Sequence, residues 1–152
     1  MAQVIESIDV DVPVRVAYDQ WTQFEEFPKF LDEVESITQT TETLTVWNVK
    51  VGPVEKQFEA EITEQHPDER VAWTSTGGEV DHGGVVTFHK LDDAKTRVTV
   101  QIDWEPTGLL EKLGGSLGSD NRAVKKDLAN FKQYIESKGT PDGSWRGDVP
   151  AN

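Results

Sequence analysis

The sequence predicts an α+β protein in which a curved, seven-stranded antiparallel sheet wraps around one long C-terminal helix. Seven segments have the composition of strands, and several of them alternate apolar and polar side chains, as strands with one buried and one solvated face do. The last regular segment instead carries apolar residues every three or four positions, which is the period of a helix. A single helix can bury such a stripe only against the sheet, and the sheet must curve to enclose it.

The N-terminal part predicts one strand followed by two short helices. Alternation from Ile8 to Val12 predicts the strand. Pro13 ends it and suits the first turn of a helix, where its missing N–H would have no partner anyway. Apolar residues at helical spacing predict a helix over 14–24, and phenylalanines around a proline predict a second helix over 24–30.

The middle of the chain predicts six further strands. Turn-forming residues separate them, and among these we expect the glycine pairs 77–78 and 83–84 to form turns and His82 to lie in a hairpin loop. The six strands are expected at 34–40, 44–51, 54–64, 70–76, 84–91 and 96–105.

The long helix is predicted over 116–138. Gly139 ends it, because glycine readily adopts the left-handed backbone that closes many helices. We expect residues 1–139 to form one domain and residues 140–152 to form a flexible tail. The apolar stripe of the helix consists of Leu117, Asn121, Val124, Leu128, Phe131 and Ile135.

Composition argues against several classes of function. The 152 residues include 28 Asp and Glu against 15 Lys and Arg, and a net charge of −13 disfavours phosphate backbones, so we expect no nucleic-acid partner. The absence of cysteine excludes disulfides and thiolate metal sites. No apolar run is long enough to span a bilayer, so we expect no stable membrane insertion and a cytoplasmic protein.

The charge is unevenly distributed along the chain. Residues 1–111 are strongly acidic, whereas basic residues outnumber acidic ones over 112–146. Two interpretations stay open. The lysines relieve repulsion on a solvated helix face, or they form a docking surface for an acidic partner.

A set of short motifs resembles one protein family. Across residues 4–138 the chain is similar to the polyketide cyclase/dehydrase-like proteins of the START-like, birch-pollen-allergen-like superfamily. The resemblance implies a helix-grip fold with a hydrophobic cavity between the sheet and the long helix. It does not imply catalysis, because the family includes aromatase/cyclases, lipid and quinone carriers and proteins without a known activity. The matching motifs lie at 12–14, 17–21, 24–30, 62–64, 67–73, 84–88, 96–98, 105–106 and 127–132.

A small hydrophobic molecule is the expected ligand of that cavity. Aromatic and aliphatic walls suit a flat or elongated apolar ligand. Two alternatives stay open: the tryptophans pack in the core, and the amide of Asn121 ties the helix to a loop instead of orienting a ligand. The expected lining residues are Phe58, Phe88, Val100, Ile102 and Trp104 from the strands and Asn121, Val124, Leu128 and Phe131 from the helix.

A glycine-rich segment, 107–119, precedes the long helix. We interpret it as a lid, in which glycines provide hinge freedom and Leu109, Leu110 and Leu113 cover the cavity. The alternative is an ordinary connector whose leucines pack under the helix. Trp145 in the tail is a second candidate for closing the cavity.

The sequence assigns no catalytic residue, and we expect neither a cofactor nor a metal ion. The histidines lack ligand spacing and are expected in solvated positions. Asp103 and Glu105 lie two residues apart on the polar face of a strand, so we expect them to be solvated. Tyr18, Asn48 and Asn121 are the candidate polar groups for a pocket that binds a poly-ketone.

Three functions remain. The first is binding or transport of a small hydrophobic ligand, such as a lipid, a quinone or a polyketide-like molecule, and the lack of an acid–base set favours it. The second is a polyketide aromatase/cyclase or dehydrase acting in the same cavity. The third is a protein-interaction module without a ligand, with contacts through basic residues of the long helix. The oligomeric state stays open.

Overall fold

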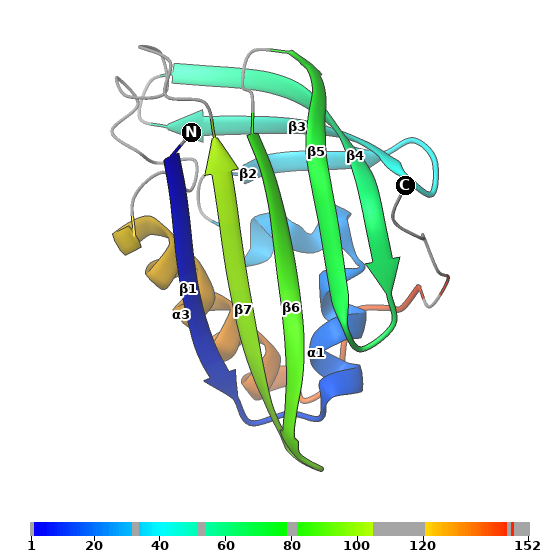
Figure 1. The fold of residues 1–152 in the computed structure, drawn as a ribbon, viewed down its shortest axis with the longest axis vertical. Coiled ribbons are helices and arrows are strands. Elements are labelled where there is room, and N and C mark those ends of the chain that lie inside the picture. The colour runs from blue at the N-terminus through cyan, green and yellow to red at the C-terminus, as the bar shows by residue number, and fades with distance from the viewer. Residues whose placement is uncertain are drawn as a thin grey trace.

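A computed structural model describes residues 2–31, 34–51, 54–78, 82–104, 121–145 and 147. Within these residues, one strand, two short helices, six strands and a long helix follow one another, in the order expected from the sequence. The elements are β1 (Ala2–Val10), α1 (Val14–Trp21), the 3₁₀ helix η1 (Phe24–Lys29), β2 (Val34–Gln39), β3 (Leu44–Val51), β4 (Val54–His66), β5 (Arg70–Gly78), β6 (His82–Asp92), β7 (Lys95–Trp104) and α3 (Asn121–Lys138) (Figure 1).

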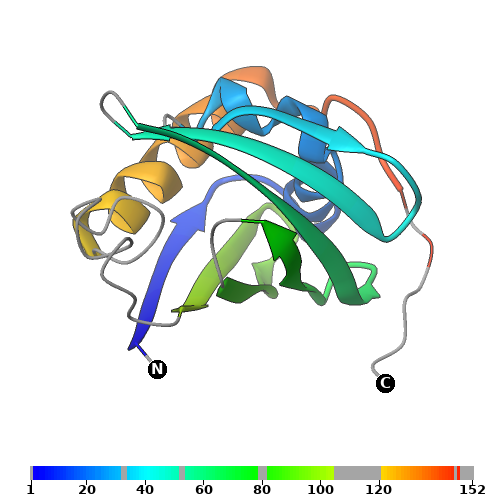
Figure 2. The same ribbon diagram turned by 90° about the horizontal axis from the view of Figure 1, so that it is seen from above.

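All seven strands form one antiparallel sheet in the order β1-β7-β6-β5-β4-β3-β2. The first and last strands of the chain are therefore neighbours, with Ile8 opposite Val98. Register shifts interrupt the β2–β3, β4–β5 and β6–β7 ladders, and such bulges increase the local twist. Figure 2 shows the sheet bending around α1, η1 and α3, which lie on its concave side. The curved sheet around a long helix is thus confirmed.

The hydrophobic core lies between the concave face of the sheet and the helices. Side chains alternate along each strand, so every second residue faces the helices. On the other side of the core, α3 buries the four stripe residues whose side chains are described, Val124, Leu128, Phe131 and Ile135, the last two of them fully. Leu117 and the side chain of Asn121 lie outside the described set. The buried strand residues include Phe58, Ala60, Ile62, Val71, Val86, Phe88, Val98, Val100 and Ile102.

Aromatic rings join the short helices to α3. On the last turn of α1, the Trp21 ring contacts Phe27 of η1 and Phe131 of α3, each with a centroid distance of 5.1 Å. Ring pairs of this kind contribute about 0.5–1.5 kcal/mol beyond their buried area. The three helical elements therefore form one layer, which covers the sheet as a unit.

The start of the fold differs from the expectation at the first strand. The strand covers Ala2–Val10, so it begins earlier than Ile8 and ends before Val12. The strand ends before Asp11 because the Asp11 N–H donates to a carboxylate oxygen of Glu136 on α3 rather than to a neighbouring strand. Val12 stays buried although it has left the sheet.

The glycine pairs expected in turns lie inside strands. Positions 77–78 belong to β5 and positions 83–84 belong to β6. His82 is likewise the first residue of β6, opposite Trp104 of β7, and not a loop residue. The glycine at position 84 leaves room for the ring of Trp73 on the neighbouring strand.

The long helix ends where the sequence predicts. Gly139 has a φ of 73°, in the left-handed region, and its N–H donates to the Ile135 carbonyl at 2.8 Å. At the other end, α3 is described from Asn121, and the expected helix start at 116 lies outside the described residues. Within the described part of the chain, no helix is long and apolar enough to cross a membrane.

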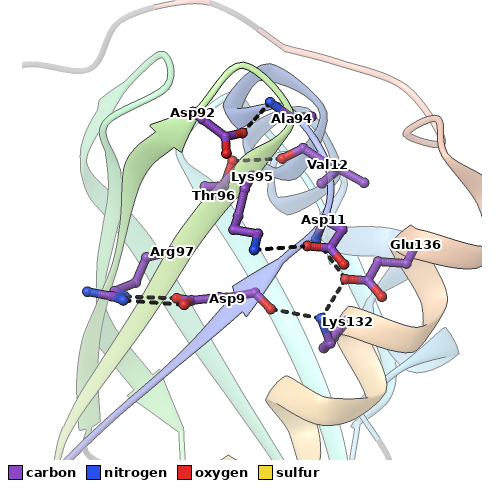
Figure 3. A network of polar contacts seen from close by, with 10 residues as sticks. All are labelled: Asp9, Asp11, Val12, Asp92, Ala94, Lys95, Thr96, Arg97, Lys132 and Glu136. Atoms are coloured by element: carbon purple, nitrogen blue, oxygen red, sulfur yellow. Dashed lines mark hydrogen bonds and ion pairs between the residues drawn. The ribbon is translucent and has the colours of Figure 1, made fainter.

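A polar network fastens α3 to the edge strand β1 (Figure 3). The Lys132 ammonium donates to the Asp9 carbonyl at 2.9 Å and to Glu136 Oε2 at 2.6 Å. The same Glu136 oxygen accepts the Asp11 N–H at 2.7 Å. Arg97 of β7 forms two hydrogen bonds with the Asp9 carboxylate, at 2.8 and 3.3 Å. The network satisfies backbone groups at the end of the edge strand and fixes the position of α3 beside it.

Candidate functional site

The candidate site is the concave face of the sheet opposite α3. The expected lining residues that the structure describes come from β4, β6, β7 and α3, and all are buried members of one core cluster. The structure therefore brings together side chains that lie up to 73 positions apart, from Phe58 to Phe131. Whether they enclose a cavity stays a prediction. These residues are Phe58, Phe88, Val100, Ile102, Val124, Leu128 and Phe131.

Other expected site residues, or their side chains, lie outside the residues that the structure describes. Trp104 is the last residue of β7 and Asn121 is the first of α3, but their side chains are outside the described set. The expected lid residues Leu109, Leu110 and Leu113 also lie outside the described residues. The lid and both interpretations of Asn121 stay predictions.

A stack of near-parallel aromatic rings lies on the concave face. Trp47 of β3 stacks on Phe58 of β4, with ring centroids 5.4 Å apart and planes 22° apart. It also stacks on Trp73 of β5 at 6.4 Å and 20°. The indole N–H of Trp47 donates to Thr45 Oγ1 at 2.8 Å, and the Thr45 hydroxyl donates to the Ala60 carbonyl at 3.0 Å. The orientation of Trp47, and with it the stack, is therefore held by buried hydrogen bonds.

Glycine at position 84 makes room for the Trp73 ring. Gly84 lies opposite Trp73 in the β5–β6 ladder, and a Cβ atom built on Gly84 would lie 2.6 Å from Trp73 Cζ2 and 2.8 Å from Cη2. The ring thus lies across the neighbouring strand where a side chain would otherwise stand. Trp73 is only partly buried, although its strand partner Ile62 is buried. An accessible aromatic surface is therefore present on the concave face.

Gly84→Ala tests this packing. We expect the added methyl group to displace the indole of Trp73 and to lower the free energy of unfolding by about 1–3 kcal/mol, since overpacking forces side chains away from their preferred positions. The near-ultraviolet circular dichroism of the stacked tryptophans should change with it.

Gly77→Ala is the matched control, because it also lies in this part of the sheet and its Cβ would meet nothing within 4 Å. Equal losses of stability in the two variants would contradict a specific contact between Gly84 and Trp73. Both proteins are compared by urea denaturation.

The lining residues expected from the sequence do not include Trp47 or Trp73. Alternation was the available signal: in β3 it places Trp47 on the same face as Thr45 and Val49, which are buried. In β5 it places Trp73 on the face of the buried Val71. The role of Gly84 had no such signal, because a glycine pair predicts a turn as readily as a close approach.

Asn48 does not face the candidate site, contrary to the expectation. Its side-chain amide donates to Ser36 Oγ at 3.0 Å and accepts from Gln57 Nε2 at 3.2 Å across three strands. Its neighbours in β3 are buried on the concave face, so alternation directs Asn48 to the convex face. Tyr18 does lie on the inner side, where its fully buried ring meets Phe88 edge-on at 5.4 Å.

Two buried donors stand out within the described part of the chain because the structure gives them no hydrogen-bond partner there. They are the indole N–H of Trp21 and the side-chain amide nitrogen of Gln65. The bulge between Ile62 and Glu64 shifts the alternation of β4 by one residue and thereby buries Gln65. An unpaired buried donor costs about 1–3 kcal/mol, so each of these groups would gain from an acceptor.

The polar groups considered for metal or acid–base chemistry are dispersed. Asp103 lies on the convex face, as expected, and accepts from Gln3 Nε2 at 2.7 Å. His89 is exposed, also as expected, and His66 lies 3.3 Å from the carboxylate of Glu64. Among the described residues, no three His, Asp or Glu side chains gather where they could hold a metal ion. Glu105 lies outside the described residues.

Two open grooves are lined by polar residues and lie apart from the apolar face. One of about 370 Å³ lies between η1 and α3, and one of about 430 Å³ lies on the convex side of β2, β3 and β4. Neither matches the expected apolar cavity. The first is lined by Lys29, Asn130, Gln133, Tyr134 and Ser137, and the second by Glu35, Ser36, Asn48, Glu55, Lys56 and Gln57.

One carboxylate beyond α3 connects the helices beside the candidate site. Asp142 accepts hydrogen bonds from Gln20 Nε2 at 3.0 Å, from the Tyr134 hydroxyl at 2.5 Å and from the Lys138 ammonium. Burial alone would raise the pKa of the Asp142 carboxyl, but the hydrogen bonds from Lys138, Tyr134 and Gln20 lower it to about 2. These contacts involve the first residues after α3, and the flexibility expected for 140–152 stays a prediction.

The pKa of Asp142 predicts a pH-dependent contribution to stability. Because the folded-state value lies below the ordinary value of 3.8, the stabilisation is present above about pH 4 and is lost as the pH falls towards about 2. We expect Asp142→Asn to lower the free energy of unfolding by about 2 kcal/mol at neutral pH, with the difference from wild type shrinking below about pH 4. Urea denaturation across this range measures it, and a difference that does not change with pH would contradict the assignment.

Comparison with known proteins gives one family and one strong relative. The model of the family described as "Polyketide cyclase / dehydrase and lipid transport" matches residues 10–132. An uncharacterised 17.2 kDa protein of Streptomyces lincolnensis is 56% identical over 149 residues, which cover 98% of this chain and 99% of that protein.

Solved structures share the fold at low sequence identity. A START superfamily protein from Mycobacterium smegmatis has a TM-score of 0.75 at 12% identity, covering 91% of this chain and 99% of the other. The Zhui aromatase/cyclase from Streptomyces sp. R1128 has a TM-score of 0.72 at 13% identity, covering 94% of this chain and 98% of the other. At such identities, the likeness concerns the fold alone.

Proposed function

Because this chain belongs to the polyketide cyclase / dehydrase and lipid transport family, we propose that it binds a small hydrophobic ligand between the concave face of the sheet and α3. The ligand is a lipid, a quinone or a polyketide-like molecule. The family's description covers both lipid transport and polyketide chemistry, so it does not choose between these ligands. The side chains of the site favour an apolar molecule.

The aromatic stack on the concave face is the observation that carries this proposal. Three rings lie nearly parallel, at 22° and 20°, and the last of them, Trp73, is partly exposed. Most other ring pairs in the core, such as Trp21 with Phe27 at 81°, meet edge-on or tilted, as rings in a filled core commonly do. A parallel stack with an accessible member is suited to contact with an apolar ligand.

The binding energy would come from apolar burial on both sides of the ligand. Val100 and Ile102 of β7 and Val124 and Leu128 of α3 are buried members of one core cluster, so most of the binding energy would come from the ligand's own apolar surface, at about 25 cal/mol for each Å² removed from water.

A polyketide cyclase or dehydrase role is the second candidate. The name of the matched family includes these activities, and the Zhui protein, which shares the fold, is described as an aromatase/cyclase. Such a reaction needs a group that transfers protons in the site. Conversion of a bound poly-ketone, detected by mass spectrometry of the released molecule, distinguishes this role from binding alone.

Quenching of tryptophan fluorescence by naphthoquinone tests binding. We expect saturable quenching with a Kd on the order of tens of micromolar or below, since one bicyclic ring system buries limited apolar area. Trp73→Leu should weaken binding by about tenfold, which corresponds to about 1.4 kcal/mol of lost ring contact. Displacement by a saturated fatty acid reports whether lipids share the site.

Val85→Ala is the control, because Val85 adjoins Gly84 in β6 but points to the convex face. It should bind naphthoquinone as wild type does. Quenching that never saturates, or equal weakening in the two variants, would count against a ligand site on the concave face.

A further inference from the structure

We infer that Asp142 is a positioning residue of the ligand site and that residues 141–145, named the latch here, set the rate at which ligand enters and leaves by holding α1, η1 and α3 together. This inference rests on the proposed function, because it concerns access to the same site. Asp142 acts through the helices it joins.

The latch returns to the helical layer because of how α3 ends. Gly139, with its left-handed φ of 73°, reverses the chain direction directly after the helix. Figure 2 shows the following segment, in red, passing beside the short helices, and Figure 1 shows it next to α1. Residues close in sequence to the end of α3 are thereby placed against the end of α1.

On the α1 side, the latch is held through both its main chain and its side chains. The Asp142 N–H donates to Gln20 Oε1 at 2.9 Å, while Gln20 Nε2 donates back to Asp142 Oδ2 at 3.0 Å. Gln20 is fully buried, so these partners replace water for its amide. Farther along, the Trp145 N–H donates to Thr22 Oγ1 at 3.1 Å.

On the other side, the same carboxylate reaches α3 and η1. The Tyr134 hydroxyl and the Lys138 ammonium, both on α3, donate to Asp142. The ammonium of Lys29 on η1 lies 3.9 Å from Asp142 Oδ2. Hydrogen bonds to an ionised acceptor are stronger than neutral ones, so one side chain connects three helical elements firmly.

The contacts lead from the latch to the candidate site. Gln20 and Thr22 flank Trp21, whose ring packs on Phe131, an expected lining residue of α3. Phe27 of η1 contacts both Trp21 and Trp47 of the stack. A ligand that enters through the helical layer, between α3 and the two short helices, needs these helices to move apart, and the latch opposes that movement because it joins all three.

Loss of the latch therefore has a kinetic signature. The latch residues do not belong to the expected lining, so removing their contacts raises the population of the open form without removing contacts to the ligand. Association and dissociation then accelerate together, and the ratio of their rate constants, Kd, stays nearly constant.

The test compares Asp142→Ala with Glu136→Ala in stopped-flow quenching by naphthoquinone. Glu136 is the matched control, because it is also a hydrogen-bonded carboxylate at the end of α3 but joins α3 to β1 through Asp11 and Lys132. We expect Asp142→Ala to raise both rate constants by about tenfold, the effect of about 1.4 kcal/mol, with Kd changed by less than about twofold. Glu136→Ala should lose comparable stability and leave both rate constants near those of wild type.

Amide hydrogen exchange of α1 provides a second reading that does not depend on a ligand. Asp142→Ala should speed exchange over Val14–Trp21, and Glu136→Ala should not. If wild type binds naphthoquinone but the two variants change the rates equally, or neither changes them, the latch inference fails and the proposed function stands. If wild type binds neither naphthoquinone nor a fatty acid, the proposed function fails, and unchanged exchange in α1 would then also reject the latch.

Discussion

The fold depends on one constraint: seven strands present a continuous apolar face, and the helical layer has to cover it. Strand alternation directs Phe58, Val86 and Val98 to the same side of the sheet, and the bulges between strands bend that side into a concave surface. Among the described residues, one long helix and two short ones cover this face. The position of this helical layer is fixed by specific contacts at its margins.

The contacts at those margins are hydrogen bonds and ion pairs, which orient the helices relative to the sheet and to one another. At one margin, Lys132 and Glu136 bind backbone groups at the end of β1; at another, Asp142 joins α3 to α1 and η1. Between them most contacts are apolar, and the side-chain amide of Asn130 on α3 donates to the Phe30 carbonyl at 3.3 Å. Polar contacts therefore fix the C-terminal end of α3, and apolar packing holds the rest of the helical layer against the sheet. Such a layer can admit an apolar molecule.

The sequence predicted the fold well because period and turn chemistry are local signals. It predicted the order of the elements and the described buried positions of α3 from spacing, and the helix end at Gly139 from the conformational freedom of glycine. It failed where tertiary contacts decide: Gly84 accommodates a ring from the next strand, and Asp142 meets partners about 120 positions away. No pattern within a short window contains either relation. The family resemblance added the helix-grip fold, and the comparisons confirm the family.

Methyl-resolved nuclear magnetic resonance shows on which face of the sheet a ligand binds. On addition of naphthoquinone, we expect the methyl signals of the concave face and α3 to shift, including those of Val100, Ile102, Val124 and Leu128. The signals of Ile5 and Val46 on the convex face should stay unchanged. Shifts confined to the convex face, or spread equally over both faces, would contradict a ligand held between the sheet and the helix.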